Sequence, residues 1–180
     1  MENTLHPPKD KNRESKYLES VLKGALEGKN AHVSIHKALE NLQVNITGKK
    51  ILNTPYTIWQ LLKHINYWQI KFLNRLEGNK DVLLLCNWQE GWEDELNASS
   101  QLELDMEIAL LKDGISKALV ILTSEGDATV IEQSYANKYE VLQAMASHVS
   151  YHLAEIILLR RIFGSWKRPV KGSYYGSYRV

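Results

Sequence analysis

Apolar residues recur every three or four positions in four long stretches of the chain, and polar breaks separate these stretches. The stretches span about residues 14–27, 58–76, 101–122 and 138–163. This spacing places the apolar side chains on one face of a helix. A shorter stretch of the same kind follows Ser34, a residue type that often caps the N-terminus of a helix. Since the sequence has few strand signals, the pattern predicts an all-α fold, a four-helix bundle.

Residues that typically start or end helices support these boundaries. Thr54 or Thr57 can cap the second long helix, and Pro55 lies near its first turn. Gly78 lies just past the end of this helix, and Gly164 lies just past the end of the last one. We therefore expect sharp helix ends at these positions.

The polar breaks also predict how the chain divides. Residues 1–13 form a polar leader, residues 14–167 form one helical domain, and residues 168–180 form a C-terminal tail with three tyrosines. The segment 80–97 contains Trp88, Gly91 and Trp92 but no helical period, so it predicts an ordered connection between two helices. A length of 180 residues suits a single domain with a substantial core.

Composition and charge exclude several classes of protein. The formal net charge of +1 gives no basic surface for nucleic acid or for an anionic membrane. No apolar run approaches the ~18 residues of a membrane span, and the leader lacks the apolar core of a secretory signal. Cys86 is the single cysteine, so an intrachain disulfide cannot form. We therefore expect a cytoplasmic protein that binds neither nucleic acid nor membranes.

Two histidines in the last stretch form an H-x-x-x-H pair. His148 and His152 lie one helical turn apart, close enough to bind one metal ion together. The apolar stripe of this helix runs through Val141, Met145, His148, His152, Ile156 and Leu159. Both imidazoles therefore face the core, where an unpaired polar group costs ~1–3 kcal/mol. A shared metal would satisfy both rings, and hydrogen bonds to the backbone or to neighbouring side chains are the alternative.

A third histidine strengthens the prediction of a metal site. His64 lies between Leu61 and Trp68 at helical spacing, so it too belongs to an inward face. A bundle can bring His64 opposite the His148/His152 pair. Three neutral imidazoles suit zinc, nickel, iron or copper and leave coordination positions open. For His32 and His36 we expect a surface or hydrogen-bonding role instead.

At this point two segments resemble the motifs of a known family, the DinB-like superfamily of DinB/YfiT-type metalloenzymes. TIWQLLKHINYW, residues 57–68, resembles the family motif of the second helix. SHVSYHLAEI, residues 147–156, with the following Leu159-Arg160-Arg161 and Gly164-Ser165-Trp166, resembles the motif of the last helix. The resemblance covers about residues 14–166, and both motifs occur in the family's order.

The resemblance implies a four-helix bundle that binds zinc, nickel or a similar ion through His64, His148 and His152, and that forms a homodimer. Relatives include thiol S-transferases that use bacillithiol, mycothiol or glutathione, as well as isomerases and hydrolases. The family commonly has Gln three residues after the second histidine of the pair, where this chain has Glu155. A carboxylate there can support a ligand, act as a base, or pair with an arginine.

The predicted site allows two kinds of chemistry. A metal with an open position lowers the pKa of bound water to ~7 and supplies hydroxide, or it holds a thiolate for transfer to an electrophile. Either reaction needs a general base, for which Glu155 and Tyr151 are the nearest candidates along the sequence. Trp68 either forms an apolar wall of the pocket or packs in the hydrophobic core without contacting a substrate. Cys86 has no histidine or acid beside it, which favours a simple free thiol.

Three functions remain open at the level of the sequence. The first is a metal-dependent enzyme of the hydrolase or thiol S-transferase type. The second is a non-catalytic helical bundle whose metal is structural and serves assembly or a stress response. The third is a bundle whose core histidines are hydrogen-bonded without any metal.

Overall fold

A computed structural model describes residues 11–29, 32–51, 53–78, 90–124 and 137–166, with side chains from residue 14 onward. These residues form helices and connections, without any strand. The helices are α1 (Lys11–Glu27), α2 (Ile35–Leu39), α3 (Val44–Thr47), α4 (Ile58–Leu76), α5 (Gln101–Thr123) and α6 (Lys138–Ile162). The prediction of an all-α fold is confirmed. Within the described ranges, no helix combines the length and apolar character needed to cross a membrane.

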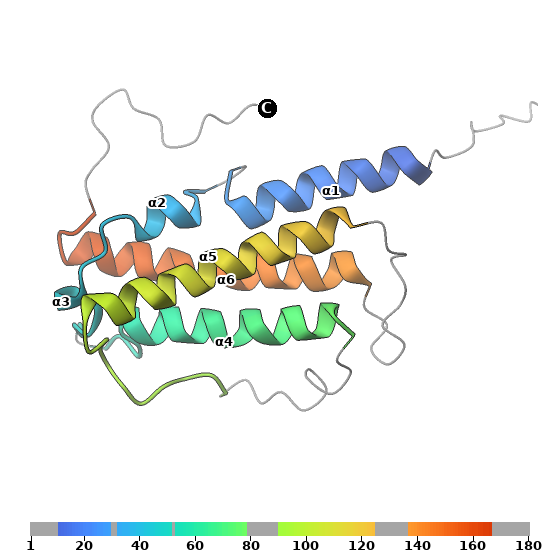
Figure 1. Cartoon of the computed structure of the whole chain (residues 1–180). Helices are drawn as coiled ribbons and strands as arrows, with labels where there is room; N and C mark the ends of the chain where they lie inside the picture. Colours follow the sequence, from blue (N-terminus) through green and yellow to red (C-terminus); the bar gives the residue numbers. More distant parts are fainter. Residues whose placement is uncertain (1–10, 30–31, 52, 79–89, 125–136, 167–180) are drawn as a thin grey trace, which may run out of the picture.

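The four long helices lie roughly side by side, with α1 and α4 on opposite sides (Figure 1). Helices α5 and α6 lie between them, and each contacts both α1 and α4. The helices bury their apolar stripes against one another, which is the main stabilising contribution for helices in a protein. The largest fully buried side chains are Leu26, Ile58, Leu61, Leu62, Ile65, Leu104, Leu111, Leu122, Leu142, Met145, Leu153 and Ile156.

Hydrogen bonds from side chains define where α4 and α6 begin. The Thr57 hydroxyl caps α4 by accepting from the backbone N–H of Gln60, and the Gln60 side-chain oxygen accepts from the backbone N–H of Thr57. Asn137 and Glu140 form the same reciprocal arrangement at the start of α6. These capping boxes satisfy backbone N–H groups that have no partner inside the helix. Since α4 and α6 carry the three candidate histidines, the caps also fix the register of the site.

Several expected boundaries are corrected by the structure. Helix α1 begins at Lys11, so it extends into the predicted leader. Pro55 precedes the Thr57 cap of α4 and lies outside the first turn. The short helix α3 occupies a segment for which the sequence predicts only a loop, because four residues are too few to show an apolar period. The C-terminal tail and Cys86 lie outside the described residues.

Close packing between α4 and α5 explains a glycine inside a helix. Gly114 lies inside the predicted apolar stretch 101–122, where a glycine has a modest cost, and α5 continues through it. A β-carbon at this position would lie 1.9 Å from the Gln69 amide nitrogen. That amide donates to the backbone oxygen of Leu110, and the amide of Asn66 donates to the backbone oxygen of Glu107. Gly114 therefore allows α4 to approach α5 closely.

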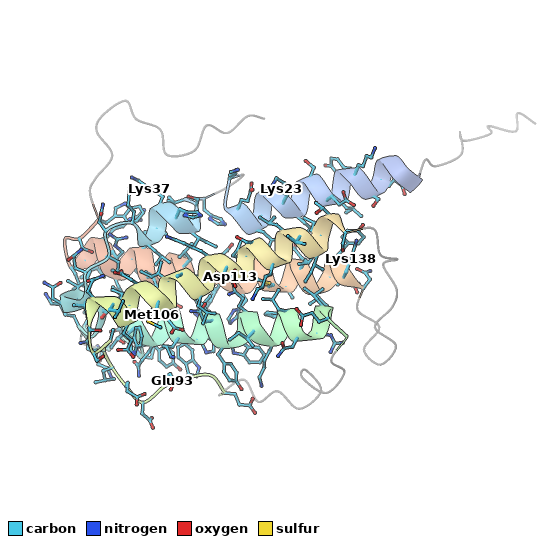
Figure 2. The ribbon with its side chains drawn as sticks, in the orientation of Figure 1. Lys23, Lys37, Glu93, Met106, Asp113 and Lys138 are labelled. Atoms are coloured by element: carbon cyan, nitrogen blue, oxygen red, sulfur yellow. The ribbon has the colours of Figure 1, made fainter. Side chains whose placement is uncertain are left out.

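Two apolar residues of α5 lie on its exposed face. Leu102 is 71% exposed. Met106, which Figure 2 labels on α5, is 65% exposed. Both lie two positions from the buried Leu104, about 200° around the helix, so the apolar residues of α5 extend beyond the face that it buries.

Arg160 connects the last helix to α2. The sequence predicts that Arg160 and Arg161 bond the final carbonyls of their own helix. Instead, Arg160 is 3% exposed and donates to the backbone oxygens of Ala38 and Glu40, at the end of α2. It also donates to the backbone oxygen of Ser165. The buried guanidinium thus satisfies carbonyls that α2 leaves without helical partners.

Candidate metal centre

Three histidines from two helices meet inside the fold. His64 projects from α4, and His148 and His152 project from adjacent turns of α6. One nitrogen from each ring can be chosen so that all three lie within 4.8 Å of one another. The Nε2 atoms of His64 and His148 are 3.3 Å apart. Two tetrahedral ligands at about 2.0–2.1 Å from one ion lie roughly 3.3–3.4 Å apart, so this pair already has the spacing of ligands.

Outer hydrogen bonds set the tautomers of two rings. The Nδ1 of His64 lies 3.3 Å from the backbone oxygen of Gly91, and the Nδ1 of His152 lies 2.7 Å from a carboxylate oxygen of Glu155. A carbonyl or carboxylate oxygen only accepts hydrogen bonds, so each Nδ1 carries the hydrogen. In the neutral form of each ring, Nε2 is then the nitrogen with the free lone pair. Metal-binding histidines in proteins are held in the same way.

His148 is less fully satisfied than its two neighbours. Its Nδ1 is buried and has no hydrogen-bond partner among the described residues. Its Nε2 faces a nitrogen of His64 that carries a lone pair, so only a hydrogen on the His148 Nε2 can join the two rings. An unpaired polar atom in the interior costs ~1–3 kcal/mol. The histidine cluster therefore contains a buried polar atom that the described residues leave without a hydrogen bond.

Aromatic rings cover one side of His64. The indole of Trp92 stacks on the imidazole with ring centroids 3.7 Å apart and an interplanar angle of 7°. Tyr56 stacks on the other face of Trp92, at a centroid distance of 3.4 Å. This stack restricts the rotation of the His64 ring and shields it from water. The sequence indicates an ordered connection around Trp92, and its contact with His64 adds a wall to the site.

The connection that carries Gly91 is attached to α4. Glu90 accepts a hydrogen bond from the Tyr67 hydroxyl at 2.9 Å and pairs with Lys71 at 2.8 Å. Gly91 has a φ of +81°, and a β-carbon there would lie 2.3 Å from a ring carbon of Tyr67. Only glycine suits both the backbone conformation and the close contact. Gly91 thereby places its carbonyl against His64.

Burial keeps two of the imidazoles neutral. Desolvation, followed by the charge of neighbouring His152, lowers the pKa of His64 to about 4. Desolvation, followed by the charges of His152 and His64, lowers the pKa of His148 to about 3. Both rings are therefore unprotonated at neutral pH, and no proton has to leave them when a metal binds. A proton and a metal ion compete for the same lone pairs, so this electrostatic environment favours the metal.

The other predicted site residues lie in different positions around the cluster. Glu155 contacts His152, which favours the role of supporting a ligand among the three that the sequence allows. Tyr151 is 66% exposed and turns its ring edge toward His152. Trp68 is 6% exposed and lies beside the rings of His64 and His148, so it is both core and wall.

Some contributors to the site are not visible in the sequence alone. Gly91 and Tyr56 lie outside the quoted motifs, and Tyr67 lies within one without an assigned role. Only the folded arrangement brings these three residues to His64 or to the connection beside it. A glycine flanked by tryptophans in a segment without helical period is the one signal that points to Gly91. His36 is exposed on α2, away from the cluster, as expected.

No protein-family model, curated protein or solved structure matches this chain. The geometry of the histidine cluster is therefore the basis of the functional argument.

Proposed function

We propose that this protein is a metal-dependent enzyme with a DinB-like four-helix bundle, in which His64, His148 and His152 bind one divalent transition-metal ion. The observation that carries the proposal is the convergence of three imidazole nitrogens, two of them with their lone pairs fixed toward the cluster. Four long helices around this cluster support the bundle architecture.

The three nitrogen donors limit which metal ions the site would bind. Neutral imidazoles favour zinc, nickel or iron over magnesium and calcium, which prefer oxygen ligands. Zinc and nickel suit this centre best, because its three candidate ligands are all imidazole nitrogens. The carboxylate of Glu155 contacts the Nδ1 of His152, on the side of the ring away from the cluster, so it is not placed as a ligand. Three protein ligands leave at least one position for water or substrate, as in catalytic rather than structural zinc sites.

A metal in this centre would supply either a hydroxide at neutral pH or a bound thiolate, which corresponds to a hydrolase or a thiol S-transferase that uses a low-molecular-weight thiol. The residues of the chain prepare the site for either reaction. Glu155 orients His152, the Gly91 carbonyl orients His64, and Trp92 excludes water from one side. Glu155 is the candidate general base; its partly exposed carboxylate has a second oxygen beyond the one that contacts His152.

The burial of the rings favours one alternative function, a non-catalytic bundle with a structural metal. His64 is 4% exposed and His152 is 8% exposed, as in sites whose metal stabilises the fold. In that case, removal of the metal lowers the melting temperature and no substrate class is turned over. The homodimer and the cytoplasmic location implied by the resemblance and the composition remain predictions, tested by sedimentation and by fractionation.

Metal analysis followed by activity assays tests the proposal. The purified protein should contain, or take up, one zinc or nickel ion per chain, and His64→Ala should abolish uptake. His36→Ala is the matched control, because this histidine is exposed and distant from the cluster. Ester or amide hydrolysis and thiol conjugation, each with and without metal, then distinguish the enzyme from the structural alternative. Absence of metal uptake by the folded wild-type protein would refute both.

A further inference from the structure

His32, which lies outside the candidate metal centre, contacts a serine of α6. The Nε2 of His32 lies 2.9 Å from the Oγ of Ser150. The two residues are 118 positions apart, so folding alone creates this contact between the connection after α1 and the middle of α6. A serine hydroxyl within hydrogen-bond distance of an imidazole is the geometry of a nucleophile and its base.

The tautomer of His32 has the orientation that such a base requires. Its Nδ1 lies 3.0 Å from the backbone oxygen of Val33, which can only accept, so Nδ1 carries the hydrogen. The lone pair of Nε2 then accepts the hydroxyl hydrogen of Ser150. A backbone carbonyl here takes the place that a carboxylate has in a catalytic triad, where it holds the imidazole in the right tautomer.

The serine opens onto a cavity. A pocket of about 300 Å³ lies between α1 and α6 and includes both Ser150 and His32 in its wall. Its other walls are mostly small and apolar: Val21, Gly24, Ala25 and Ala146. Such a wall accommodates a short, uncharged acyl chain.

A hydrogen-bond donor also lies in this pocket. Ser147, one turn before Ser150, accepts a hydrogen bond from the side-chain amide of Gln143 at 3.0 Å. Its own hydroxyl hydrogen is then available to donate. Hydroxyl groups next to a nucleophile can stabilise the negative oxygen that develops on an attacked carbonyl.

We propose that Ser150 and His32 form a nucleophile–base pair that cleaves small, uncharged acyl esters in this pocket. The Ser150 Oγ forms a bond with the acyl carbon while its proton moves to the His32 Nε2. The ester C–O bond then breaks, and the leaving alkoxide takes this proton. Water next attacks the acyl-serine with His32 as base, which releases the carboxylic acid and restores the Ser150 hydroxyl.

This second site is separate from the metal centre. Ser150 is two residues from both His148 and His152, which corresponds to a rotation of about 200° around the helix axis. The histidines project toward α4, whereas Ser150 projects toward α1. The reactivity of Ser150 should therefore be independent of any metal.

Labelling with diisopropyl fluorophosphate tests the proposal on the full-length protein. In the reaction the Ser150 Oγ forms a bond to phosphorus, fluoride leaves, and His32 takes the proton. Peptide mapping by mass spectrometry should locate the phosphoryl group on Ser150 of the folded wild-type protein, before and after treatment with EDTA. Absence of label on Ser150, or its loss on chelation of metal, would overturn the proposal.

Variants separate catalysis from a structural contact. His32→Ala should slow labelling and the hydrolysis of p-nitrophenyl acetate by ~10²-fold or more, the usual contribution of a general base. Ser150→Ala should remove both the labelling at this position and the hydrolysis of p-nitrophenyl acetate. Ser116→Ala is the control, because this helical serine bonds a carbonyl of its own helix. If His32→Ala only lowers the melting temperature while labelling is unchanged, the contact is a structural tether and the proposal is wrong.

Discussion

The Nε2 atoms of His64 and His148 face each other at 3.3 Å, although 84 positions separate the two residues in the chain. Two imidazole nitrogens at this distance can share a hydrogen or an ion, and the second outcome also requires a third ligand nearby. His152 is placed to be that third ligand, with its ring centroid 4.8 Å from that of His64 and 4.7 Å from that of His148. The fold alone therefore groups the three imidazoles as the proposed metal centre requires.

Glu155 should control how tightly the centre binds metal. We expect Glu155→Ala to lower metal affinity by about 10–100-fold, because the His152 ring loses the acceptor that fixes its tautomer and orientation. Glu155→Gln should lower the metal affinity less than Glu155→Ala does, since an amide oxygen also accepts the hydrogen bond. Competition titration with a chromophoric chelator measures both. Equal affinities for the wild-type and Glu155→Ala proteins would show that this contact has no role.

Gly91 should be more sensitive to substitution than another glycine with the same backbone conformation. Gly91→Ala strains a φ of +81° and also pushes against Tyr67, which displaces the carbonyl that accepts from His64. Gly78→Ala is the matched control, because its φ is +91° but a β-carbon there meets no atom of the described residues within 4 Å. Strain alone should cost roughly 1–2 kcal/mol in both variants. Only Gly91→Ala should also weaken metal binding, which thermal melts with and without zinc would show.

The stability of the metal-free protein should fall in mild acid. The pKa of His64 is lowered to about 4 and that of His148 to about 3, whereas an unfolded histidine titrates near ~6.5. Between these values the unfolded chain binds protons that the folded chain excludes, so unfolding becomes more favourable as pH falls. Stability is thus fully present above about pH 6.5 and is lost toward pH 4. Urea titrations in EDTA at pH 7 and pH 5 measure this loss, and His148→Gln should reduce it.

A substitution away from the site should affect the fold alone. Gly114→Ala places a β-carbon against the Gln69 amide, so we expect a destabilisation of about 1–3 kcal/mol from overpacking between α4 and α5. Metal affinity should remain within twofold of the wild-type value. Urea denaturation and chelator competition on the same preparation separate the two effects. A large loss of affinity would indicate that the spacing of α4 and α5 also positions His64.

The sequence predicts the long helices and the inward position of the three candidate histidines because both depend on local periodicity. His64, His148 and His152 lie in apolar stripes, and stripes face the core. The contacts around these histidines do not depend on periodicity. Gly91 and Trp92 reach His64 through a connection without periodicity, and the contact between His32 and Ser150 spans two elements far apart in the chain. No local pattern encodes such contacts.

The burial of individual apolar residues shows the same limit. Leu102 belongs to the apolar pattern of α5, but the structure places it in solvent. The sequence of a helix indicates its apolar face, but the residues that cover this face are determined by the whole fold. Likewise, the sequence predicts that Arg160 bonds carbonyls of its own helix, whereas the structure shows it donating to the backbone oxygens of Ala38 and Glu40 at the end of α2.

Metal stoichiometry tests the central claim most directly. The wild-type protein, stripped with chelator and dialysed against zinc or nickel, should retain one ion per chain by inductively coupled plasma mass spectrometry. The His64→Ala and His148→Ala variants should retain none while circular dichroism shows them still helical, and His36→Ala should retain one. A folded wild-type protein that retains no ion, or variants that retain as much as the wild type, would contradict the assignment of His64, His148 and His152 as a metal centre.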